Sequence, residues 1–337
     1  MKTDLETMLA SRDWLLTDGA TGTNLFNQGL PAGEAPELWN TDEPEKIRNL
    51  YRSAVNAGSD LFLTNSFGGN ASRLKLHHAQ NRVHELNKAA AALGREVADA
   101  ADRPVIVAGS MGPTGDIMEP VGTLSVADAA DMFEEQARGL MDGGADVLWV
   151  ETISAPEELR AAAIGIGRVG APWCCTMSFD TAGRTMMGVT SADMVRLVDS
   201  LEHRPLAFGA NCGVGASDIL RTLRGMKEAA PDLPLIAKGN AGIPKFVDGH
   251  VHYDGTPELM ADYAALAREI GATIIGGCCG TGPEHLRAMH ARLSEMVPGD
   301  PPTLEEIEAR LGGFSSDSDG TGAPTAKRRS SNRRRRV

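Results

Sequence analysis

The sequence lacks three features that would assign it to common protein classes. It has no run of about eighteen apolar residues, so no membrane-spanning helix is predicted. Its N-terminal stretch MKTDLETMLASRDW has no apolar signal core, and we therefore expect a cytoplasmic protein. Its five cysteines include two adjacent pairs, unlike the disulfide framework of a small secreted domain. In a reducing compartment such thiols stay free for metal binding or catalysis.

Basic residues are scarce outside the C-terminal end. The formal net charge is −12, and residues 315–337 alone carry one Lys and six Arg against two Asp, which leaves −17 for the remaining body. That charge argues against nucleic acid as a partner of the body. Because residues 315–337 contain almost no apolar side chains, we predict a disordered Arg-rich tail. It is either a solvated tail without a partner or an arm that contacts RNA, lipid or a second copy.

Short apolar runs recur along the chain, and polar residues or glycines follow each of them. They occupy residues 14–22, 60–69, 104–112, 146–154, 173–180, 206–213, 233–242 and 272–280. Near-continuous apolar runs of this length are typical of strands that are buried on both faces.

Amphipathic segments between these runs predict helices. They cover residues 44–58, 70–98, 125–143, 156–167, 190–202, 215–229, 256–271 and 283–297. Ser125 and Thr256 are expected N-caps, and Gly143 and Gly271 are expected stops.

Eight β–α units predict a single α/β domain, a (β/α)8 TIM barrel over residues 1–300, with a helical extension over 301–314. A doubly wound open sheet is the competing architecture. The stretch DGATGTN after the first run lacks the G-x-G-x-x-G spacing of that fold, which favours the barrel.

Polar groups and thiols cluster at the ends of the predicted strands, where barrel enzymes carry their active sites. These residues are Asp18, Gly19, Asn65, Ser110, Glu151, Ser178, Asn211, Cys212, Lys238, Asn240, Cys278 and Cys279. A requirement for stability alone would not concentrate such residues there.

Three of the cysteines are candidate metal ligands. Cys212, Cys278 and Cys279 lie at two strand ends that open into the same mouth. Three thiolates form a soft site suited to zinc, with a fourth position left open for chemistry. The competing interpretation makes Cys278 and Cys279 small buried core residues. For Cys174 and Cys175, which lie inside a predicted strand, we expect burial in the core.

The stretches DGATGTNL, GSDLFLTNSFGGN, VLWVET, GANCG and GGCCGTGPEHL resemble the homocysteine S-methyltransferase family over about residues 12–297. That family includes betaine–homocysteine methyltransferases and the homocysteine-binding module of cobalamin-dependent methionine synthase. The resemblance implies a (β/α)8 barrel and zinc held by Cys212, Cys278 and Cys279. It also implies methyl transfer to the sulfur of homocysteine, giving methionine.

The resemblance also suggests roles for residues around the metal. Glu151 matches the acid expected to bind the homocysteine ammonium group, and Asp18 is expected near that group or the reacting centre. Backbone N–H groups around Gly19, Ala20 and Thr21 would receive the carboxylate. Asn240 resembles a residue that fills the fourth metal position before substrate binds.

The methyl donor is the open part of this prediction. A quaternary ammonium or sulfonium donor needs aromatic faces, for which Trp39 and Phe67 are the candidates. Where animal betaine enzymes carry tyrosines, this chain has Gly68 and Thr152. Glycine betaine is our first choice. Dimethylsulfoniopropionate, S-methylmethionine and a corrinoid protein remain alternatives, although the chain has no corrinoid-binding D-x-H-x-x-G motif.

Two other classes compete with a methyltransferase. A zinc hydrolase would use His250, His252 and Asp254, although H-x-H lies here in a loop after the seventh strand. A non-catalytic module would bind homocysteine or zinc and pass it to a partner. A homo-oligomer is possible, and the sequence does not determine its size.

Overall fold

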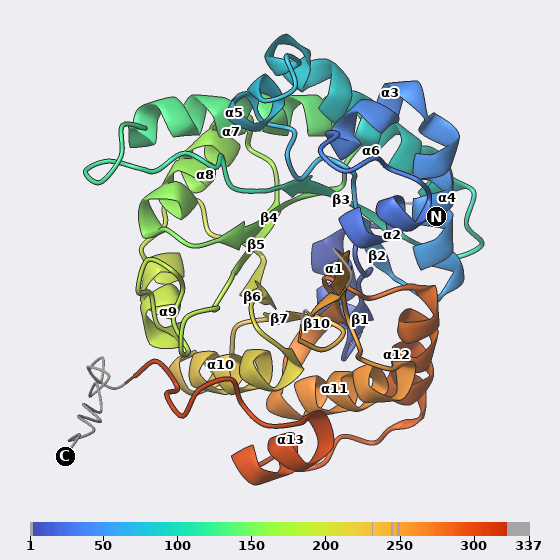
Figure 1. The fold of residues 1–337 in the computed structure, drawn as a ribbon, viewed down its shortest axis with the longest axis vertical. Coiled ribbons are helices and arrows are strands. Elements are labelled where there is room, and N and C mark those ends of the chain that lie inside the picture. The colour runs from blue at the N-terminus through green and yellow to red at the C-terminus, as the bar shows by residue number, and fades with distance from the viewer. Residues whose placement is uncertain (1–2, 231, 244, 248–249, 322–337) are drawn as a thin grey trace, which may run out of the picture.

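The computed structural model describes residues 3–230, 232–243, 245–247 and 250–321, and a ring of eight parallel strands lies at its centre (Figure 1). The strands are β1 (Leu15–Leu16), β2 (Leu61–Leu63), β3 (Ile106–Met111), β4 (Val147–Ile153), β5 (Trp173–Met177), β6 (Ala207–Cys212), β7 (Leu235–Gly239) and β10 (Ala272–Gly277). Their order in the sheet is β1-β10-β7-β6-β5-β4-β3-β2. All eight predicted strands are present, and the predicted TIM barrel is confirmed.

Side-chain carboxylates help to close the ring between β1 and β2. The N–H of Asp60 donates to the Leu16 carbonyl at 2.7 Å, and the Asp60 carboxylate accepts from the Leu16 N–H at 2.9 Å. Two residues further along the chain, nearer the carboxyl ends of the strands, the Asp18 carboxylate accepts from the Leu63 N–H at 2.9 Å. Asp18 therefore takes part in barrel closure as well as lying at a strand end.

Helices surround the strands as predicted. They are α1 (Leu5–Ser11), α2 (Gly22–Asn27), α3 (Trp39–Asp42), α4 (Pro44–Asn56), α5 (Ala71–Lys75), α6 (Val83–Asp99), α7 (Val126–Asp142), α8 (Pro156–Val169), α9 (Ser191–Asp199), α10 (Ala216–Ala229), α11 (Pro257–Ile270), α12 (Pro283–Glu295) and α13 (Leu304–Leu311). The side chains of Ser125 and Thr256 cap α7 and α11, and Gly271 ends α11 with φ 99°. These predicted start and stop signals are confirmed.

The helix predicted over 70–98 is wrong as a single element. The structure divides it into α5, a short 3-10 turn (Gln80–Arg82) and α6. The break includes His78, whose φ is 56°, and the Ala79 N–H donates to the Leu74 carbonyl to close α5. No glycine or proline marks this point in the sequence, so the pattern did not reveal it.

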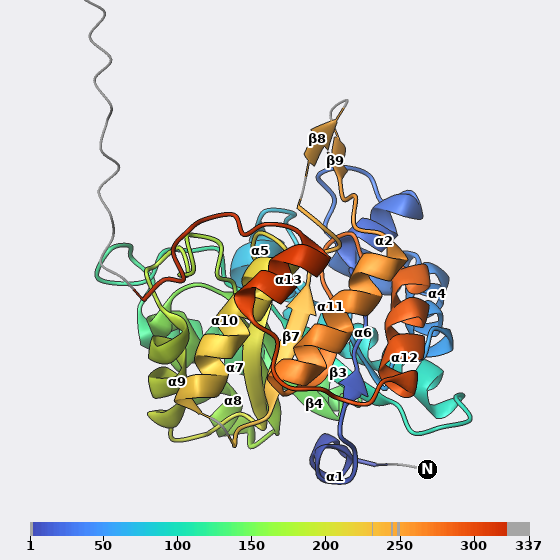
Figure 2. The same ribbon diagram turned by 90° about the horizontal axis from the view of Figure 1, so that it is seen from below.

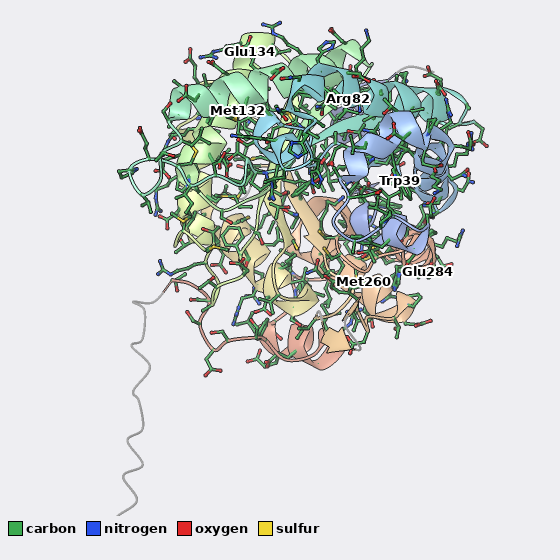
Figure 3. The ribbon with its side chains drawn as sticks, turned by 45° about the horizontal axis from the view of Figure 1, so that its top comes forward. Trp39, Arg82, Met132, Glu134, Met260 and Glu284 are labelled. Carbon is green, nitrogen blue, oxygen red and sulfur yellow. The ribbon has the colours of Figure 1, made fainter. Side chains whose placement is uncertain are left out.

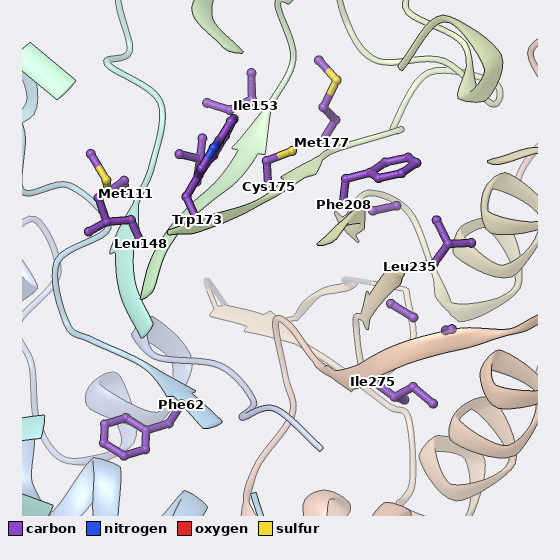
Figure 4. Close-up of a cluster of buried hydrophobic side chains, with 14 of the residues drawn as sticks. Phe62, Met111, Leu148, Ile153, Trp173, Cys175, Met177, Phe208, Leu235 and Ile275 are labelled. Carbon is purple, nitrogen blue, oxygen red and sulfur yellow. The ribbon is translucent and has the colours of Figure 1, made fainter. Parts of the chain in front are cut away.

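The barrel separates two apolar regions. Inside the ring, Trp149, Cys174 and other small and branched residues pack with Leu5 and Met8 of α1, which covers the amino ends of the strands. Outside the ring, side chains such as Trp173 and Phe208 project toward the helices (Figure 4). Apolar side chains thus fill the barrel interior at the amino ends of the strands. Only the interior layer near the carboxyl ends of the strands is polar.

A two-stranded antiparallel hairpin, which the sequence analysis missed, follows β7. It consists of β8 (Lys245–Val247) and β9 (His250–His252). Figure 2 shows it beyond the carboxyl ends of the strands, on the side opposite α1. The chain returns from it through Tyr253 to α11, so the hairpin delivers this tyrosine to the mouth of the barrel.

The C-terminal part of the chain lies against the outside of the barrel. Within the predicted 301–314 extension, α13 packs on α10 and α11. Ser315 donates from its N–H and hydroxyl to the Asp218 carboxylate, and Gly320 approaches Gly183. The Lys and Arg residues of the predicted tail all fall in 322–337, outside the described residues, so its disorder stays a prediction. No described helix combines the length and apolarity needed to cross a membrane.

Candidate active site

A layer of polar side chains lies inside the barrel near the carboxyl ends of the strands. Because side chains alternate along a strand, Trp149 belongs to the apolar interior and Glu151, two residues on, faces the same side nearer the mouth. The same alternation places four further buried polar side chains in this layer: Ser110 of β3, Thr176 of β5, Asn211 of β6 and Lys238 of β7. The polar layer is therefore the floor of the mouth.

Three thiols meet above this floor. The Sγ atoms of Cys212, Cys278 and Cys279 all lie within 4.8 Å of one another, and the Cys212–Cys279 separation is 4.0 Å. A tetrahedral zinc ion with sulfur at about 2.3 Å has sulfur–sulfur edges of about 3.8 Å. All three cysteines are half-buried, so the cluster is partly open. The soft donor set and its spacing fit zinc bound by three cysteinates.

The backbone brings the cysteine segments together. Cys212 has φ 59° and Gly213 has φ 68°, so the chain turns sharply where β6 ends. Cys212 is paired in the sheet with Gly239 of β7, whose carbonyl accepts from the Cys278 N–H at 2.7 Å. The left-handed conformation of a non-glycine residue costs about 1–3 kcal/mol and is maintained by these surrounding contacts.

Asn240 connects the same two segments through its side chain. Its Oδ1 accepts from the Cys279 N–H at 3.1 Å, and its Nδ2 donates to the Gly213 carbonyl at 3.2 Å. The sequence analysis expected this residue at the metal or the substrate. Its amide braces the two loops that carry the thiols, and its role at the metal or the substrate stays a prediction.

The close contacts among the three thiols shift the pKa of each in different directions. Hydrogen bonds from Cys212 and Cys278 lower the pKa of Cys279, and the same close contacts raise the pKa of Cys212. Three thiolates this close repel one another unless a cation lies between them. The electrostatics of the cluster therefore favour a bound dication.

Lys238 and Asp18 form a buried ion pair on the floor. The Lys238 Nζ lies 2.5 Å from Asp18 Oδ1, and Lys238 is only 2% exposed. Burial lowers the pKa of Lys238, but the charges of Asp18 and Glu151 outweigh this effect and raise it overall. Asp18 also accepts from Thr17 Oγ1 and the Leu63 N–H. Its carboxylate is thus largely occupied by the protein itself.

Glu151 has a different environment. Its Oε1 accepts from Ser110 Oγ at 2.5 Å, and the residue is 9% exposed. Burial raises the pKa of Glu151 to about 7, and the negative charges of Cys278 and Asp18 contribute to this shift while Lys238 and Ser110 oppose it. Near neutral pH this carboxyl group can therefore hold or release a proton.

A bend in β4 places Glu151 at the floor. Thr152 has φ 63°, and the register with β5 shifts between Val150 and Ile153. The Asn211 amide holds this bend, since its Oδ1 accepts from the Thr152 N–H at 2.9 Å and its Nδ2 donates to Thr152 Oγ1 at 2.8 Å. The same Nδ2 lies 3.8 Å from Cys278 Sγ. Asn211 therefore links the acid to the thiol cluster.

The loop after β1 packs against Thr281. A Cβ on Gly19 would lie 2.4 Å from the Thr281 carbonyl oxygen, so only glycine fits there. The Ala20 N–H donates to that oxygen at 3.1 Å and is not free for a substrate carboxylate, which corrects the expectation for Ala20. Thr21 precedes α2 and makes no capping hydrogen bond with its side chain.

The two aromatic candidates for a donor pocket differ in position. Trp39 is 6% exposed and packs in the outer apolar core, with Lys46 Nζ 4.1 Å from its ring centre. It lies among the N-terminal helices (blue in Figure 3), where ordinary packing accounts for its burial, and its role in a donor cage stays a prediction. Phe67 is half-buried after β2, and its ring borders Gly112 after β3.

The residues of the rival hydrolase site lie at the hairpin. His250 and His252 belong to β9, and their side chains fall outside the described residues. Within the described part of the chain, the three cysteines are the only metal-compatible group of this kind.

Sequence reasoning assigned no specific role to Lys238 and Asn211, and it missed Tyr253. Lys238 and Asn211 stood at predicted strand ends, where polar residues in apolar runs were the signal. The hairpin that carries Tyr253 gave no comparable signal.

Comparisons with known proteins support a common family. A family model described as "Homocysteine S-methyltransferase" matches residues 15–293. Methionine synthase from Mycobacterium tuberculosis (strain ATCC 25618 / H37Rv) is 31% identical over 310 residues, covering 87% of this chain and 26% of that protein. Methionine synthase from Mycobacterium leprae (strain TN) is 30% identical over 319 residues, covering 90% and 26%. The chain thus spans about a quarter of the length of these relatives.

Solved structures agree. The homocysteine methyltransferase MmuM from Escherichia coli, in its metallated form, superposes with a TM-score of 0.71 at 25% identity, covering 86% of this chain and 99% of that chain. Its oxidized form gives a TM-score of 0.70 at 26% identity, with the same coverage of both chains.

Proposed function

We propose, because this chain belongs to the homocysteine S-methyltransferase family, that it transfers a methyl group from an onium donor to the sulfur of homocysteine in a zinc-dependent reaction. The product is methionine, and glycine betaine is the first candidate donor. The observation that carries the proposal is the convergence of three half-buried thiols above a floor that contains the buried acid Glu151. We also expect a reducing compartment such as the cytoplasm, because the cysteines must stay reduced to bind a metal.

Cys212, Cys278 and Cys279 would hold the zinc ion. Zinc at such a site stabilises a thiolate at neutral pH, whereas a free thiol has a pKa of about 8.5 and is mostly protonated. The residues around the cluster then have to orient the amino acid and keep its sulfur directed at the donor methyl group.

Charge on the floor suits one ammonium group. Asp18 and Glu151 contribute two negative charges and Lys238 one positive charge, which leaves one negative charge in a buried layer. Since the carboxylate of Asp18 already has several partners, we assign the homocysteine ammonium group to Glu151. Asp18 then acts by holding Lys238 in place and by closing the barrel.

The transfer is an in-line displacement. The bond from sulfur to the methyl carbon forms while the bond from that carbon to the donor nitrogen breaks, and its electron pair stays on nitrogen. The positive charge of the donor is lost in this step and no protein group needs to transfer a proton. Phe67 supplies an aromatic face near the mouth for a cationic donor.

A corrinoid protein is the second candidate donor, and the surface of the mouth favours it. Seven of the ten large apolar side chains that are exposed in the described residues lie between a barrel strand and the main helix that follows it: Phe26, Leu76, Ile117, Val121, Met186, Met187 and Ile243. Exposed apolar side chains that form one patch are a feature of protein docking surfaces.

A donor panel tests the proposal. Reduced, zinc-loaded protein is incubated with homocysteine and, separately, with glycine betaine, dimethylsulfoniopropionate, S-methylmethionine or a methylated corrinoid protein, and methionine is measured. We expect methionine with glycine betaine and none from the Cys279→Ser variant. Methionine with the corrinoid protein alone would replace the donor assignment. No methionine from any donor would favour the non-catalytic module.

A further inference from the structure

Hydroxyl groups of the segment after β2 hold the backbone of Ser110 in β3. The Ser110 N–H donates to Thr64 Oγ1 at 3.0 Å, and the Ser66 hydroxyl donates to the Ser110 carbonyl at 2.7 Å. Thr64 is itself fixed by its backbone, since its N–H donates to the Ala108 carbonyl at 2.9 Å. Ser110 is thus held at both its N–H and its carbonyl.

The direction of each hydrogen bond in this group can be assigned. A hydroxyl has one hydrogen to donate, and Ser66 uses its hydrogen on the Ser110 carbonyl. In the contact of 2.6 Å between Thr64 Oγ1 and Ser66 Oγ, Thr64 is therefore the donor. The bonds form a closed ring, and water does not compete for it because Thr64, Ser66 and Ser110 are each only 1% exposed.

The side chain of Ser110 takes no part in the ring and points to Glu151. Its hydroxyl donates to Glu151 Oε1 at 2.5 Å, and within the described residues this oxygen is its only acceptor. The second oxygen, Oε2, has no hydrogen-bond partner in the described part of the chain and is not fully buried. One oxygen of the acid is thus occupied by the protein and the other is open to the mouth.

We propose that Ser110 is a positioning residue for the amino group of homocysteine, because its hydroxyl holds Oε1 of Glu151 and leaves Oε2 as the acceptor for the ammonium group. This inference rests on the proposed function. The terminal torsion of a glutamate has no sharply preferred angle, so a free carboxylate would turn. With Oε1 held by β3, Oε2 keeps one direction. The site should then prefer thiols that carry an α-amino group over thiols that lack one.

Two ligands that differ only in the amino group test the proposal. They are homocysteine and 4-sulfanylbutanoate, and both can bring a sulfur to the same metal. Dissociation constants are measured by calorimetry with reduced, zinc-loaded, full-length protein. The variants are Ser110→Ala, Glu151→Gln and the combination of both.

Ser59→Ala is the matched control. It removes another fully buried serine hydroxyl, which lies before β2 and donates to the Thr17 carbonyl at 3.2 Å. Zinc content and circular dichroism check the fold of each variant. Thr64→Val opens the hydroxyl ring and leaves Ser110 unchanged, and it takes the place of Ser110→Ala if that variant does not fold.

Ser110→Ala should bind homocysteine about 10-fold more weakly, since residues of one hydrogen-bond network are energetically coupled, and should bind 4-sulfanylbutanoate as the wild type does. Thr64→Val should show a smaller loss that is also confined to homocysteine. Because Ser110 acts through Glu151, the double variant should bind homocysteine no more weakly than Glu151→Gln. Ser59→Ala should match the wild type with both ligands.

Three results would overturn the proposal. The first is an equal loss for both ligands in Ser110→Ala, and the second is a double variant in which the two single losses add. The third is a wild type that binds both ligands equally, in which case methionine formation still tests the proposed function by itself. A wild type that binds neither ligand would overturn the proposed function, and this inference with it.

Discussion

The molecule contains two adjacent cysteine pairs with opposite surroundings. Cys174 and Cys175 lie inside β5 and are fully buried, and burial raises the pKa of Cys174 to about 12 and that of Cys175 well above the ordinary value of a thiol. Cys278 and Cys279 come directly after β10 and are half-buried beside Cys212. The same dipeptide thus gives inert core residues in one place and a candidate metal site in the other.

Backbone direction explains the difference. Within a strand, neighbouring side chains face opposite sides, and Cys174 accordingly joins the barrel interior while Cys175 joins the outer core. After the strand end, the chain turns at Gly280 and both sulfurs approach Cys212. Adjacent cysteines can therefore share a metal in a turn but not in a regular strand.

The largest expected effect comes from removing one thiol of the pair Cys278 and Cys279. Cys279→Ser should lose bound zinc and lower methionine formation by more than about 100-fold, the upper end of what outer-shell changes alone cost. The barrel should remain folded, because its core does not depend on this partly exposed side chain. Zinc content, turnover and circular dichroism check these three statements. Undiminished zinc binding would contradict the ligand assignment.

Charged neighbours are the second difference between the two cysteine pairs, because the ion pair of Lys238 and Asp18 lies on the floor below Cys278 and Cys279. Lys238→Met leaves Asp18 buried without its counter-ion, and loss of one partner of a buried pair costs about 3–5 kcal/mol of unfolding free energy. Chemical denaturation measures this loss. The double variant with Asp18→Asn should recover part of it, and a double variant as unstable as the sum of both single changes would show that the pair is not coupled.

Glu151→Gln should weaken homocysteine binding. A hydrogen bond to a charged group contributes about 1.5–3 kcal/mol, so the KM for homocysteine should rise about 10- to 100-fold. Because the pKa of Glu151 is raised to about 7, the wild type should lose affinity as pH falls from 8 to 6 and the acid takes up its proton. The variant should lack this part of the pH profile. Equal pH profiles for the wild type and the variant would contradict the assignment of Glu151 to the ammonium group.

The smallest effect is expected in the core pair. Cys175→Ala removes one buried sulfur and should lower the unfolding free energy by only about 1–2 kcal/mol, as a small core truncation does. Zinc content and turnover should match the wild type. Any loss of zinc in this variant would remove the distinction between the pairs.

Much of the fold could be predicted because buried parallel strands and their capped helices leave strong local patterns. Trp173 and its apolar neighbours marked β5, and Ser125 marked the start of α7. The thiol cluster followed, because strand ends meet at one mouth. The break at His78 and the hairpin after β7 depend on tertiary contacts, and no turn residue announced the break.

Side-chain roles were harder to predict than positions. Trp39 follows the first strand in sequence, and its ring packs in the outer core with Lys46 Nζ 4.1 Å from its centre. Lys238 was named only as a strand-end residue, since its ion pair with Asp18 joins residues 220 apart in the chain. Asn240 lies where expected, yet its amide bonds to backbone groups and not to an open position. Such pairings depend on rotamers and on distant contacts.

X-ray absorption at the zinc edge tests the central claim most directly. The account predicts three sulfur neighbours per zinc from Cys212, Cys278 and Cys279, and one further sulfur neighbour when homocysteine is added. Fewer than three sulfur neighbours, or no change on addition of homocysteine, would contradict it.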